Sequence, residues 1–374
     1  MTSTAPLKLF SPIQIDSFTL QHRVVHAPMT RLRSEADDSP SEMMVDYYAQ
    51  RASEGGLLIT EATHPSFFAR GYLGGPGIYT DAHVAGWKKV TDAVHAKGGK
   101  IFMQLGHDGR QSHVDLSDGR APIAPSEVPF ETNVLTQDGW VPVSMHRAVT
   151  LDEIPGLVEM FRLAAVRARL AGFDGVELHN ANGYLADTFL QDGTNRRSDA
   201  YGGTVEKRAR FSLELVDALV SVWGASRVGV RVSPSGQWGS ISDSDPEATF
   251  GYFAERLNER GIGYLHVIEP RIMGTETIDE AAAPVAASFL RTKFAGTIIA
   301  AGGFDRDGAE AIIARGDADL VAFGRWFSSN PDLPARLKAN APLTRYERDA
   351  FWGGDRRHYT DFPNHGAATG GINS

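Results

Sequence analysis

The chain contains no cysteine. This absence excludes a disulfide framework, a cysteine-ligated zinc site and an iron–sulfur cluster, so any redox chemistry requires a bound organic cofactor. The sequence also lacks an apolar run of the roughly 20 residues that span a bilayer, and its first residues lack the layout of a signal peptide. We therefore expect a cytoplasmic protein that is not bound to a membrane.

Basic charge is scarce as well. The 37 Lys and Arg residues are outnumbered by 46 Asp and Glu residues, which gives a formal net charge of -9. Nucleic-acid binding requires a basic face that neutralises phosphates, so the charge balance excludes this class. The hydrophobic fraction of 42% over 374 residues is sufficient for a large folded core.

Common hydrolase and metal motifs are missing. The chain has no Gly-x-Ser-x-Gly nucleophile elbow, no P-loop, and no helical His-x-x-x-His or Glu-x-x-His pair with an orienting acid. A hydrolase would therefore lack a nucleophile, and we expect no metal site.

The chain repeats one unit, in which a helical stretch ends at Gly and an apolar run follows. These runs are hydrophobic almost throughout, as strands buried on both faces are. We predict strands at 24–29, 57–62, 101–105, 176–179, 228–233, 264–268, 298–301 and 320–323, and helices at 43–52, 84–96, 157–170, 205–222, 246–260 and 307–315. Eight alternating units predict a (β/α)8 TIM barrel that forms one domain over residues 1–374. A doubly wound open sheet is disfavoured, because residues 29–33 are not the Gly-rich fingerprint that should follow its first strand.

Three segments fall outside this repeat. Residues 1–22 read as a β-hairpin, with strands 13–15 and 18–20, that plugs the bottom of the barrel. Residues 106–150 form a connection far longer than an ordinary βα loop, which predicts a lid over the active site. Residues 341–374 are rich in aromatic side chains, so we expect them to pack on the barrel.

The carboxyl ends of the strands carry the polar residues, and active sites of such barrels lie there. The first four strand ends supply Pro28, Met29 and Thr30, then Glu61 and Ala62, then Gln104, and finally His179, Asn182 and Tyr184. The last three residues combine two neutral hydrogen-bond donors with a phenol. A lone His is usually a core residue, but this grouping favours a site that grips an oxygen and delivers a proton beside it.

The seventh and eighth strands end in two glycine-containing runs. They are Ala301, Gly302 and Gly303, and Phe323, Gly324 and Arg325. A Gly pair alone is more often an ordinary tight turn. Because Arg325 adds a bidentate anion donor, we favour a phosphate site.

Arg231 is a charge inside the apolar fifth strand. One interpretation is a buried arginine paired with a carboxylate across the barrel, for which Glu61 is the available partner. Its position at a strand end favours the other interpretation, a contact with a cofactor or substrate.

Seven motifs occur in order between about Leu9 and Pro363. They are APMTR at 27–31, EAT at 61–63, QLGHDGR at 104–110, HNANGY at 179–184, NRRSDAYGGTVEKR at 195–208, RVSP at 231–234 and AFGR at 322–325. Together they resemble the Old Yellow Enzyme family of FMN-dependent ene-reductases.

The resemblance implies non-covalently bound FMN across the barrel mouth, with NAD(P)H as a transient co-substrate. It places the FMN phosphate at the glycines and Arg325, the pyrimidine edge of the flavin at Gln104 and Arg231, and its O4 atom at Thr30. The full implied cofactor site is Pro28, Met29, Thr30, Ala62, Gln104, His179, Arg231, Ala301, Gly302, Gly303, Phe323, Gly324 and Arg325.

The resemblance also implies how a substrate binds. His179 and Asn182 would donate to the oxygen of an activated alkene, such as an α,β-unsaturated carbonyl, maleimide or nitroalkene. Tyr184 would protonate the α carbon while flavin N5 gives hydride to the β carbon. Tyr72 and Trp352 would form part of the pocket wall, and Gly106, where many relatives have a large aromatic, would widen it.

Several alternatives stay open at this point. The same site would serve a physiological reductase of nitrate esters or nitroaromatics. Two alternatives belong to other functional classes: a barrel lyase or isomerase that uses no flavin, and a flavin-binding protein without catalytic activity. The sequence is compatible with a monomer or a homodimer.

Overall fold

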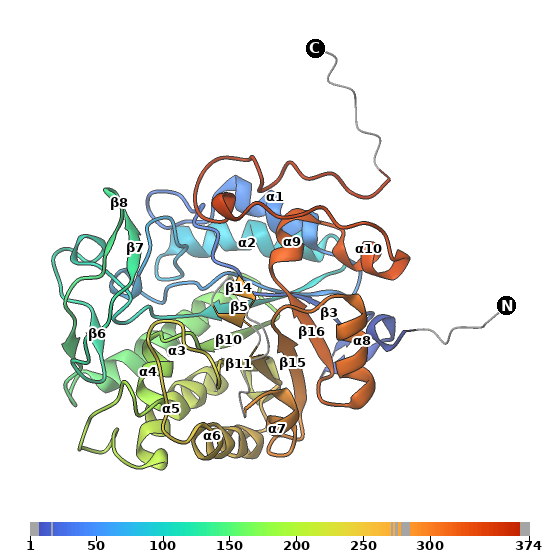
Figure 1. Cartoon of the computed structure of the whole chain (residues 1–374). Helices are drawn as coiled ribbons and strands as arrows, with labels where there is room; N and C mark the ends of the chain where they lie inside the picture. The colour runs from blue at the N-terminus through green and yellow to red at the C-terminus, as the bar shows by residue number, and fades with distance from the viewer. Residues whose placement is uncertain (1–6, 16–17, 271, 274–275, 278–284, 367–374) are drawn as a thin grey trace.

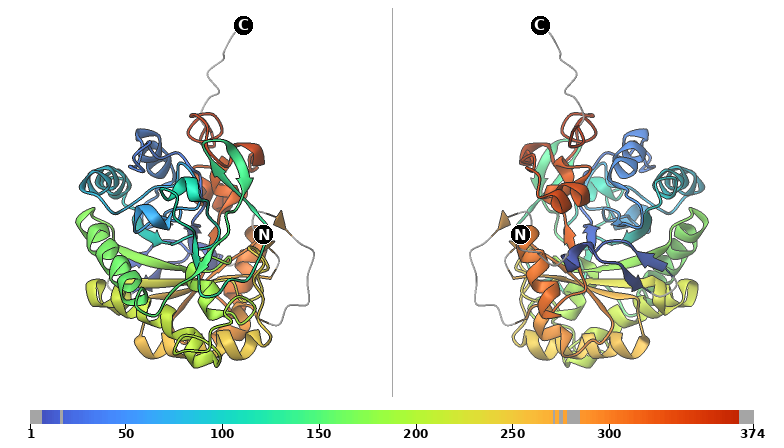
Figure 2. Two further views of the ribbon diagram at one scale, coloured as in Figure 1. Left: turned by 90° about the vertical axis from the view of Figure 1, so that its left-hand side faces the viewer. Right: turned by 90° about the vertical axis from the view of Figure 1, so that its right-hand side faces the viewer.

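We describe a computed structural model of the chain, which covers residues 7–15, 18–270, 272–273, 276–277 and 285–366. Eight parallel strands form a closed barrel with helices around it (Figures 1 and 2). In chain order the strands are β3 (Val24–His26), β4 (Leu57–Ile59), β5 (Lys100–Leu105), β10 (Gly175–Asn180), β11 (Val228–Val232), β12 (Tyr264–Ile268), β15 (Thr297–Ala301) and β16 (Leu320–Phe323). Strand β16 pairs with β3 and closes the barrel, which confirms the predicted TIM barrel.

The longer helices lie where the sequence predicts them. They are α1 (Glu42–Arg51), α2 (Asp81–His95), α3 (Ile154–Leu170), α5 (Val205–Trp223), α6 (Pro246–Arg260) and α8 (Arg306–Arg315). The side chains of Ser41, Thr80, Asp245 and Asp305 cap four of these helices at the N-terminus. The shorter α4 (Leu185–Leu190), α7 (Ala287–Arg291), α9 (Arg325–Ser329) and α10 (Leu333–Ala339) were not predicted, because so few residues give no clear helical period.

The lower interior of the barrel is an apolar cluster closed by the N-terminal hairpin. Strands β1 (Ile13–Ile15) and β2 (Phe18–Leu20) pair antiparallel, and the ring centroids of Phe18 and Phe102 lie 6.1 Å apart. Interior glycines leave room for the rings: a Cβ at Gly229 would lie 2.1 Å from the Tyr264 ring. The hairpin therefore plugs the barrel bottom, as predicted, although its turn at 16–17 and residues 1–6 lie outside the described residues.

The segment from 106 to 150 contains structure that the sequence did not predict. It holds η3 (Val114–Leu116), β6 (Ile123–Ala124), β7 (Asn133–Thr136), β8 (Gly139–Pro142) and β9 (Arg147–Ala148). Strands β7 and β8 form a hairpin whose turn uses Gly139 at φ 91°. Figure 2 shows this hairpin beside the C-terminal segment, and the rings of Trp140 and Trp352 lie 5.5 Å apart.

The C-terminal segment, described to residue 366, runs back over the barrel after α10. Three buried arginines hold its backbone carbonyls: Arg31 Nε donates to Phe351 (2.9 Å), Arg33 to Ala350 (3.1 Å) and Arg51 to Tyr359 (3.0 Å). These contacts place aromatic residues of the segment at the barrel mouth. Residues 367–374 lie outside the described part. The remaining short elements are η1 (Lys8–Phe10), η2 (Phe67–Ala69), η4 (Ala225–Arg227), β13 (Ile272–Met273), β14 (Glu276–Thr277) and η5 (Arg348–Ala350).

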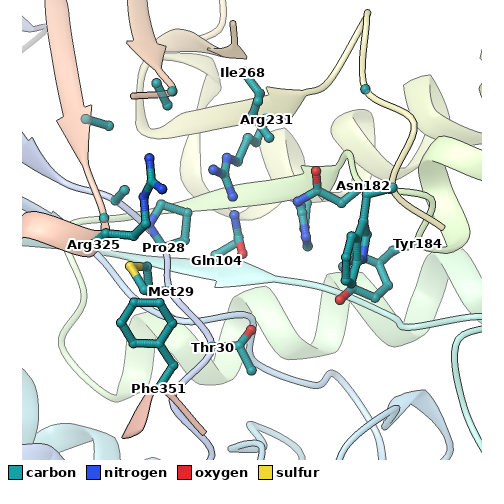
Figure 3. A pocket seen from close by; sticks show the side chains of 18 of the residues that line it. Pro28, Met29, Thr30, Gln104, Asn182, Tyr184, Arg231, Ile268, Arg325 and Phe351 are labelled. Atoms are coloured by element: carbon teal, nitrogen blue, oxygen red, sulfur yellow. The ribbon is translucent and has the colours of Figure 1, made fainter. Parts of the chain in front are cut away.

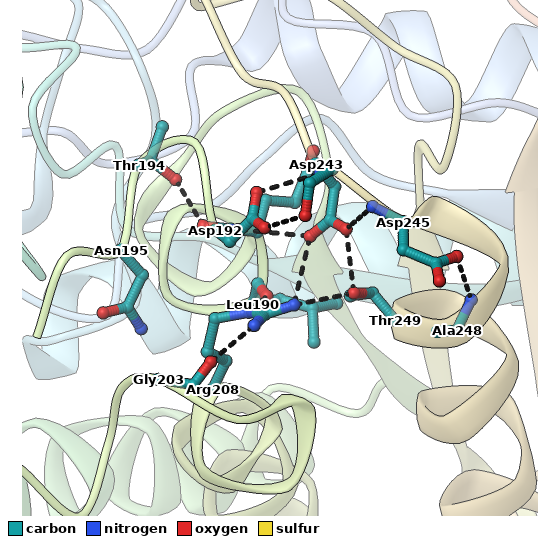
Figure 4. A network of polar contacts seen from close by, with 12 residues as sticks. Leu190, Asp192, Thr194, Asn195, Gly203, Arg208, Asp243, Asp245, Ala248 and Thr249 are labelled. Carbon is teal, nitrogen blue, oxygen red and sulfur yellow. Dashed lines mark hydrogen bonds and ion pairs between the residues drawn. The ribbon is translucent and has the colours of Figure 1, made fainter. Parts of the chain in front are cut away.

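Arg208 ties the segment after α4 to the loop before α6 (Figure 4). Its guanidinium donates to the carbonyls of Leu190 (2.9 Å) and Gly203 (2.7 Å), and to Thr249 Oγ1 (2.8 Å). It also lies 3.4 Å from the buried carboxylate of Asp243. This network holds α4, the helix that follows the HNANGY motif, against α5 and α6.

In the described residues no helix is both long and apolar enough to cross a membrane.

Candidate active site

A cavity of about 490 Å³ opens at the carboxyl ends of the strands (Figure 3). Nearly all of the predicted site residues line it: Pro28, Met29, Thr30, Tyr72, Gln104, His179, Asn182, Tyr184, Arg231, Ala301, Gly302, Gly303, Phe323, Gly324, Arg325 and Trp352. Barrel topology thus brings strand-end residues from Pro28 to Arg325 to one site, although they lie far apart in the chain.

Ala62 and Gly106 do not line this cavity. A Cβ at Gly106 would lie 3.4 Å from the Cβ of His179 and 3.5 Å from the Cβ of Ala62, so Gly106 adjoins both residues. The contact of Ala62 with a cofactor stays a prediction. The expectation that Gly106 widens the cavity likewise stays a prediction.

Strand register explains the polar centre of the site. His179 on β10 is aligned with Arg231 on β11, and Arg231 with His266 on β12. Glu177 is aligned with Gln104 on β5, and Gln104 Nε2 donates to Glu177 Oε1 at 2.7 Å. Side chains two positions apart share a face of a strand, so Glu177 and His179 both point into the barrel.

The carboxylate that balances Arg231 is Glu177, which corrects the expectation that Glu61 is the available partner. Glu61 instead accepts from the backbone N–H groups of Arg31 (2.9 Å) and Leu32 (3.2 Å). Burial alone would raise the pKa of Glu177, but His266, Arg231 and Gln104 together hold that pKa below its usual range. Burial lowers the pKa of the Arg231 guanidinium, and the charge of Glu177 opposes this effect.

His266 is a third member of this buried group, because its Nδ1 lies 2.9 Å from Glu177 Oε2. Burial lowers the pKa of His266, so the neutral ring donates to the carboxylate. The barrel interior beneath the cavity therefore holds one anion, Glu177, and one cation, Arg231, whose charges offset each other.

The HNANGY turn holds the second polar group. Asn182 has φ 60° and Gly183 φ 71°, and the turn is held by bonds from Asn182 N to Ser233 Oγ (2.8 Å) and from Gln111 Nε2 to Asn182 O (2.8 Å). Asn tolerates this left-handed conformation better than most residues. The His179 and Tyr184 rings lie 5.0 Å apart, so both face one space.

Both rings are held in their neutral forms. Burial, with the nearby charge of Arg231, holds the pKa of His179 well below its usual value. Burial also raises the pKa of Tyr184 well above its usual value, and Tyr72 and Asp108 add to this rise. At neutral pH the site therefore presents a neutral imidazole, which donates without a charge, and a phenol that keeps its proton.

Two buried polar atoms at the cavity have no protein partner among the described residues: Arg231 Nε and His179 Nδ1. Gly302 and Gly303 have φ values of 124° and 65°, and a Cβ at Gly324 would lie 2.7 Å from Met29 Sδ. These three glycines leave the backbone of this part of the cavity without side chains, and Met29 packs against Gly324. Figure 3 shows Arg325 and Tyr184 at opposite ends of the cavity, with Gln104 and Arg231 between them. An anionic group at one end and a flat polar ring in the middle fit this layout, and FMN has both.

Sequence reasoning missed part of the wall. The additional lining residues are Ala27, Thr132, Asn133, Trp140, Gly236, Gln237, Trp238, Ile268, Phe304, Ala322, Trp326 and Phe351. Several come from the lid and from the C-terminal segment, whose position no local pattern reveals. The available signal for Trp140 was its place in the predicted lid; its side chain lies on β8 and is 48% exposed.

Comparison with known proteins agrees with this geometry. The family model described as NADH:flavin oxidoreductase / NADH oxidase family matches residues 8–344. The 12-oxophytodienoate reductase 2 of Arabidopsis thaliana is 45% identical over 363 residues, which are 95% of this chain and 95% of that protein. Among solved structures, morphinone reductase in complex with tetrahydroNAD has a TM-score of 0.89 and 46% identity, covering 96% of this chain and 98% of its own. The Old Yellow Enzyme homologue of Zymomonas mobilis has a TM-score of 0.91 and 40% identity, covering 95% and 99%.

These matches span nearly the whole chain and confirm the resemblance drawn from its motifs. They exclude the flavin-free lyase or isomerase considered above, because the family consists of flavin oxidoreductases. The chain belongs to the NADH:flavin oxidoreductase / NADH oxidase family, that of Old Yellow Enzyme, and is an FMN-dependent oxidoreductase.

Proposed function

We propose that this chain uses NAD(P)H to reduce the C=C bond of activated alkenes, such as α,β-unsaturated carbonyls, maleimides and nitroalkenes. One observation carries the proposal: a neutral His, an Asn and a protonated phenol share one cavity with Gln104 and Arg231. Morphinone reductase, to which the chain is similar, was solved with a nicotinamide analogue bound. This likeness supports a nicotinamide as the reductant.

Bound FMN would supply the hydride, first received from the nicotinamide and then passed to the alkene. Gly302, Gly303, Gly324 and Arg325 would hold its phosphate. Gln104 and Arg231 would hold the pyrimidine edge, where a cation stabilises negative charge on a reduced ring. Glu177 orients Gln104 and keeps Arg231 charged, so it acts through both residues.

His179 and Asn182 would donate to the carbonyl or nitro oxygen of the substrate and withdraw charge from its double bond. A neutral imidazole suits this task, because its N–H donates a hydrogen bond without adding a charge to the site. Tyr184 would then protonate the α carbon. Tyr72, Trp140 and Trp352 wall the outer part of the cavity.

A second candidate function uses the same groups. Nitrate esters and nitroaromatics also present oxygens to two neutral donors, and they accept electrons without needing the proton from Tyr184. The two functions differ in their dependence on that phenol.

Anaerobic half-reactions test the proposal directly. The purified protein with FMN is expected to be yellow, to be bleached by NADH or NADPH, and to be reoxidised by cyclic enones and maleimides. Reoxidation by nitrate esters or nitroaromatics alone would favour the second candidate. A yellow protein that neither nicotinamide bleaches would be a flavin-binding protein without this activity.

His179→Ala is expected to slow reoxidation by a cyclic enone about 10²-fold, because one of the two donors to the developing oxyanion is lost. Stopped-flow measurement of reoxidation gives the rate constant, and flavin absorbance reports cofactor content. Asn133→Ala is the matched control, since Asn133 lines the same cavity but is not one of the two proposed donors to the substrate oxygen. Equal rate constants for His179→Ala and the control would show that His179 does not donate to the substrate oxygen.

A further inference from the structure

Aromatic side chains gather at the outer end of the cavity, and the chemistry proposed above gives them no role beyond that of a wall. Three of them come from separate parts of the chain: Tyr72 from the loop between β4 and α2, Trp140 from β8 and Trp352 from the C-terminal segment. The two tryptophans are 48% and 37% exposed. Soluble proteins rarely leave neighbouring large apolar side chains exposed unless these meet a ligand or a partner.

The three rings form one connected series. The ring centroids of Tyr72 and Trp140 lie 6.2 Å apart and those of Trp140 and Trp352 lie 5.5 Å apart, with interplanar angles of 63° and 70°. Trp352 in turn lies 6.1 Å from the buried ring of Phe351. Edge-to-face pairs of this kind are a preferred aromatic geometry. At the inner end, Tyr184 packs against the apolar cluster that contains Tyr72, so the series leads from the proposed proton donor to the cavity mouth.

Backbone hydrogen bonds hold the segments that carry these rings. Leu73 N donates to Leu135 O at 2.8 Å, which joins the loop between β4 and α2 to strand β7 of the lid hairpin. Gly353 N, in the residue after Trp352, donates to Arg31 O at 2.9 Å. The rings therefore stand in place before a ligand arrives, and a preformed surface reduces the ordering cost of binding.

The charges of the cavity lie away from these rings. Among the described residues that line it, only Arg231 and Arg325 are charged, and the proposed function assigns both to FMN. The polar side chains that the lid and the loop after β11 add to the lining are neutral: Thr132, Asn133 and Gln237. An ionised group on a substrate would meet no opposite charge from these residues, whereas a flat apolar group would meet aromatic rings.

We propose that Tyr72, Trp140 and Trp352 form an aromatic subsite that selects activated alkenes carrying an uncharged, flat aromatic group. The inference rests on the proposed ene-reduction, because it concerns the part of the substrate beyond the reacting double bond. His179 and Asn182 would hold the oxygen at the inner end, and the aromatic group would extend outward along the ring series. Contact between rings then adds binding free energy that a small alkene cannot gain.

Three maleimides that share one reacting double bond test the aromatic subsite: N-phenylmaleimide, N-methylmaleimide and N-cyclohexylmaleimide. The cyclohexyl compound matches the phenyl compound in size but is not flat. Because the chain has no cysteine, these compounds find no thiol to alkylate. Stopped-flow reoxidation of the FMN-loaded, nicotinamide-reduced enzyme at several concentrations gives an apparent dissociation constant for each. We expect N-phenylmaleimide to bind about 10-fold more tightly than the methyl compound and about 3-fold more tightly than the cyclohexyl compound.

Removal of single rings locates the aromatic subsite. Trp140→Ala and Trp352→Ala are each expected to lower the ratio of phenyl to methyl affinity about 3- to 10-fold, with N-methylmaleimide as the internal reference within each variant. Trp140→Phe keeps a ring and should retain most of the preference. Phe68→Ala is the matched control, because Phe68 is an aromatic residue with 40% exposure that does not line the cavity. If an alanine variant does not fold, Trp140→Leu and Trp352→Leu answer the same question.

The reduced products measure binding without turnover. N-phenylsuccinimide and N-methylsuccinimide have no double bond left to reduce, so isothermal titration calorimetry with the oxidised, FMN-loaded enzyme reports affinity alone. We expect the same preference for the phenyl compound, and the same loss of that preference in Trp140→Ala.

A phenyl preference that is missing in the wild type, or that survives removal of both tryptophans, would overturn the inference. Equal affinities for the phenyl and cyclohexyl compounds would also overturn it, because the cavity would then select apolar bulk. So would weaker nicotinamide binding with an intact phenyl preference, which would assign the rings to the adenine of the dinucleotide. Failure of the proposed function is recognised separately: no maleimide would reoxidise the wild-type enzyme, while the succinimide titrations would still report on the rings.

Discussion

Tyr184→Phe is expected to lower the rate constant for reoxidation by a weakly activated cyclic enone by about 10²- to 10⁴-fold, the range in which general acid catalysis contributes. The phenol is buried beside His179, and its raised pKa keeps it protonated at neutral pH. Without its proton donor, the substrate carbanion must take a proton from water in a cavity walled by aromatic rings. Reduction of FMN by the nicotinamide uses no proton from Tyr184 and should be unchanged.

Stopped-flow spectroscopy of both half-reactions checks this result. Tyr201→Phe is the control, because its hydroxyl donates to Glu214 and lies outside the lining of the cavity. Loss of flavin reduction with unchanged enone reduction in Tyr184→Phe would show that the phenol serves the nicotinamide and not the alkene.

Asp187→Asn is expected to gain stability relative to the wild-type protein as the pH rises from about 4 to about 7. Asp187 is fully buried in α4 and accepts from Gly183 N (2.9 Å) and Gln191 Nε2 (2.8 Å). Burial raises the pKa of Asp187 from 3.8 to about 7, while the two donors oppose this rise. The folded protein therefore holds this proton more tightly than the unfolded chain does.

The sign of the effect follows from that difference. The contribution of Asp187 to the free energy of unfolding is complete below its unfolded pKa of 3.8, and it is lost as the pH rises through about 7. The loss is about 4 kcal/mol, at about 1.4 kcal/mol per pH unit. The amide of the variant cannot ionise, so denaturant unfolding at several pH values should show the free energy of unfolding of the variant, minus that of the wild type, rising by this amount between about pH 4 and pH 7. The exposed Asp217, paired with Arg260, provides an Asp→Asn control.

Parallel profiles for the wild type and Asp187→Asn would show that Asp187 is ionised in the folded protein. The hydrogen bonds from Gly183 N and Gln191 Nε2 would then lower the pKa of Asp187 by more than burial raises it. An ionised carboxylate would hold the turn that carries Asn182.

The barrel was predictable because its signals are local and repeated. Strands buried on both faces, such as β11 and β15, read as continuous apolar runs, and caps such as Asp245 mark the helix starts. The β7–β8 hairpin was missed because its strands are short and lie in a polar segment. The short helix α4 was missed because it directly follows the HNANGY turn.

The site was predictable where a residue stands at a strand end, because topology alone then places it at the barrel mouth. Glu177 was overlooked because its role depends on strand register, which aligns it with Gln104, and on the inward face that it shares with His179. The rings of Trp140 and Trp352 meet between the lid and the C-terminal segment, and neither segment indicates the other in the sequence. Long-range pairs of this kind require the folded chain.

The proposed ene-reduction is tested most directly by the positions of two hydrogens in the product. The FMN-loaded enzyme would be reduced anaerobically with nicotinamide that carries deuterium at C4, mixed with a cyclic enone, and the product analysed by NMR, with a second reaction in D₂O. We expect nicotinamide-derived deuterium at the β carbon and solvent-derived deuterium at the α carbon, the latter incorporated much more slowly in Tyr184→Phe. Solvent deuterium at the β carbon, or a nicotinamide-reduced enzyme that leaves the enone unchanged, would contradict it.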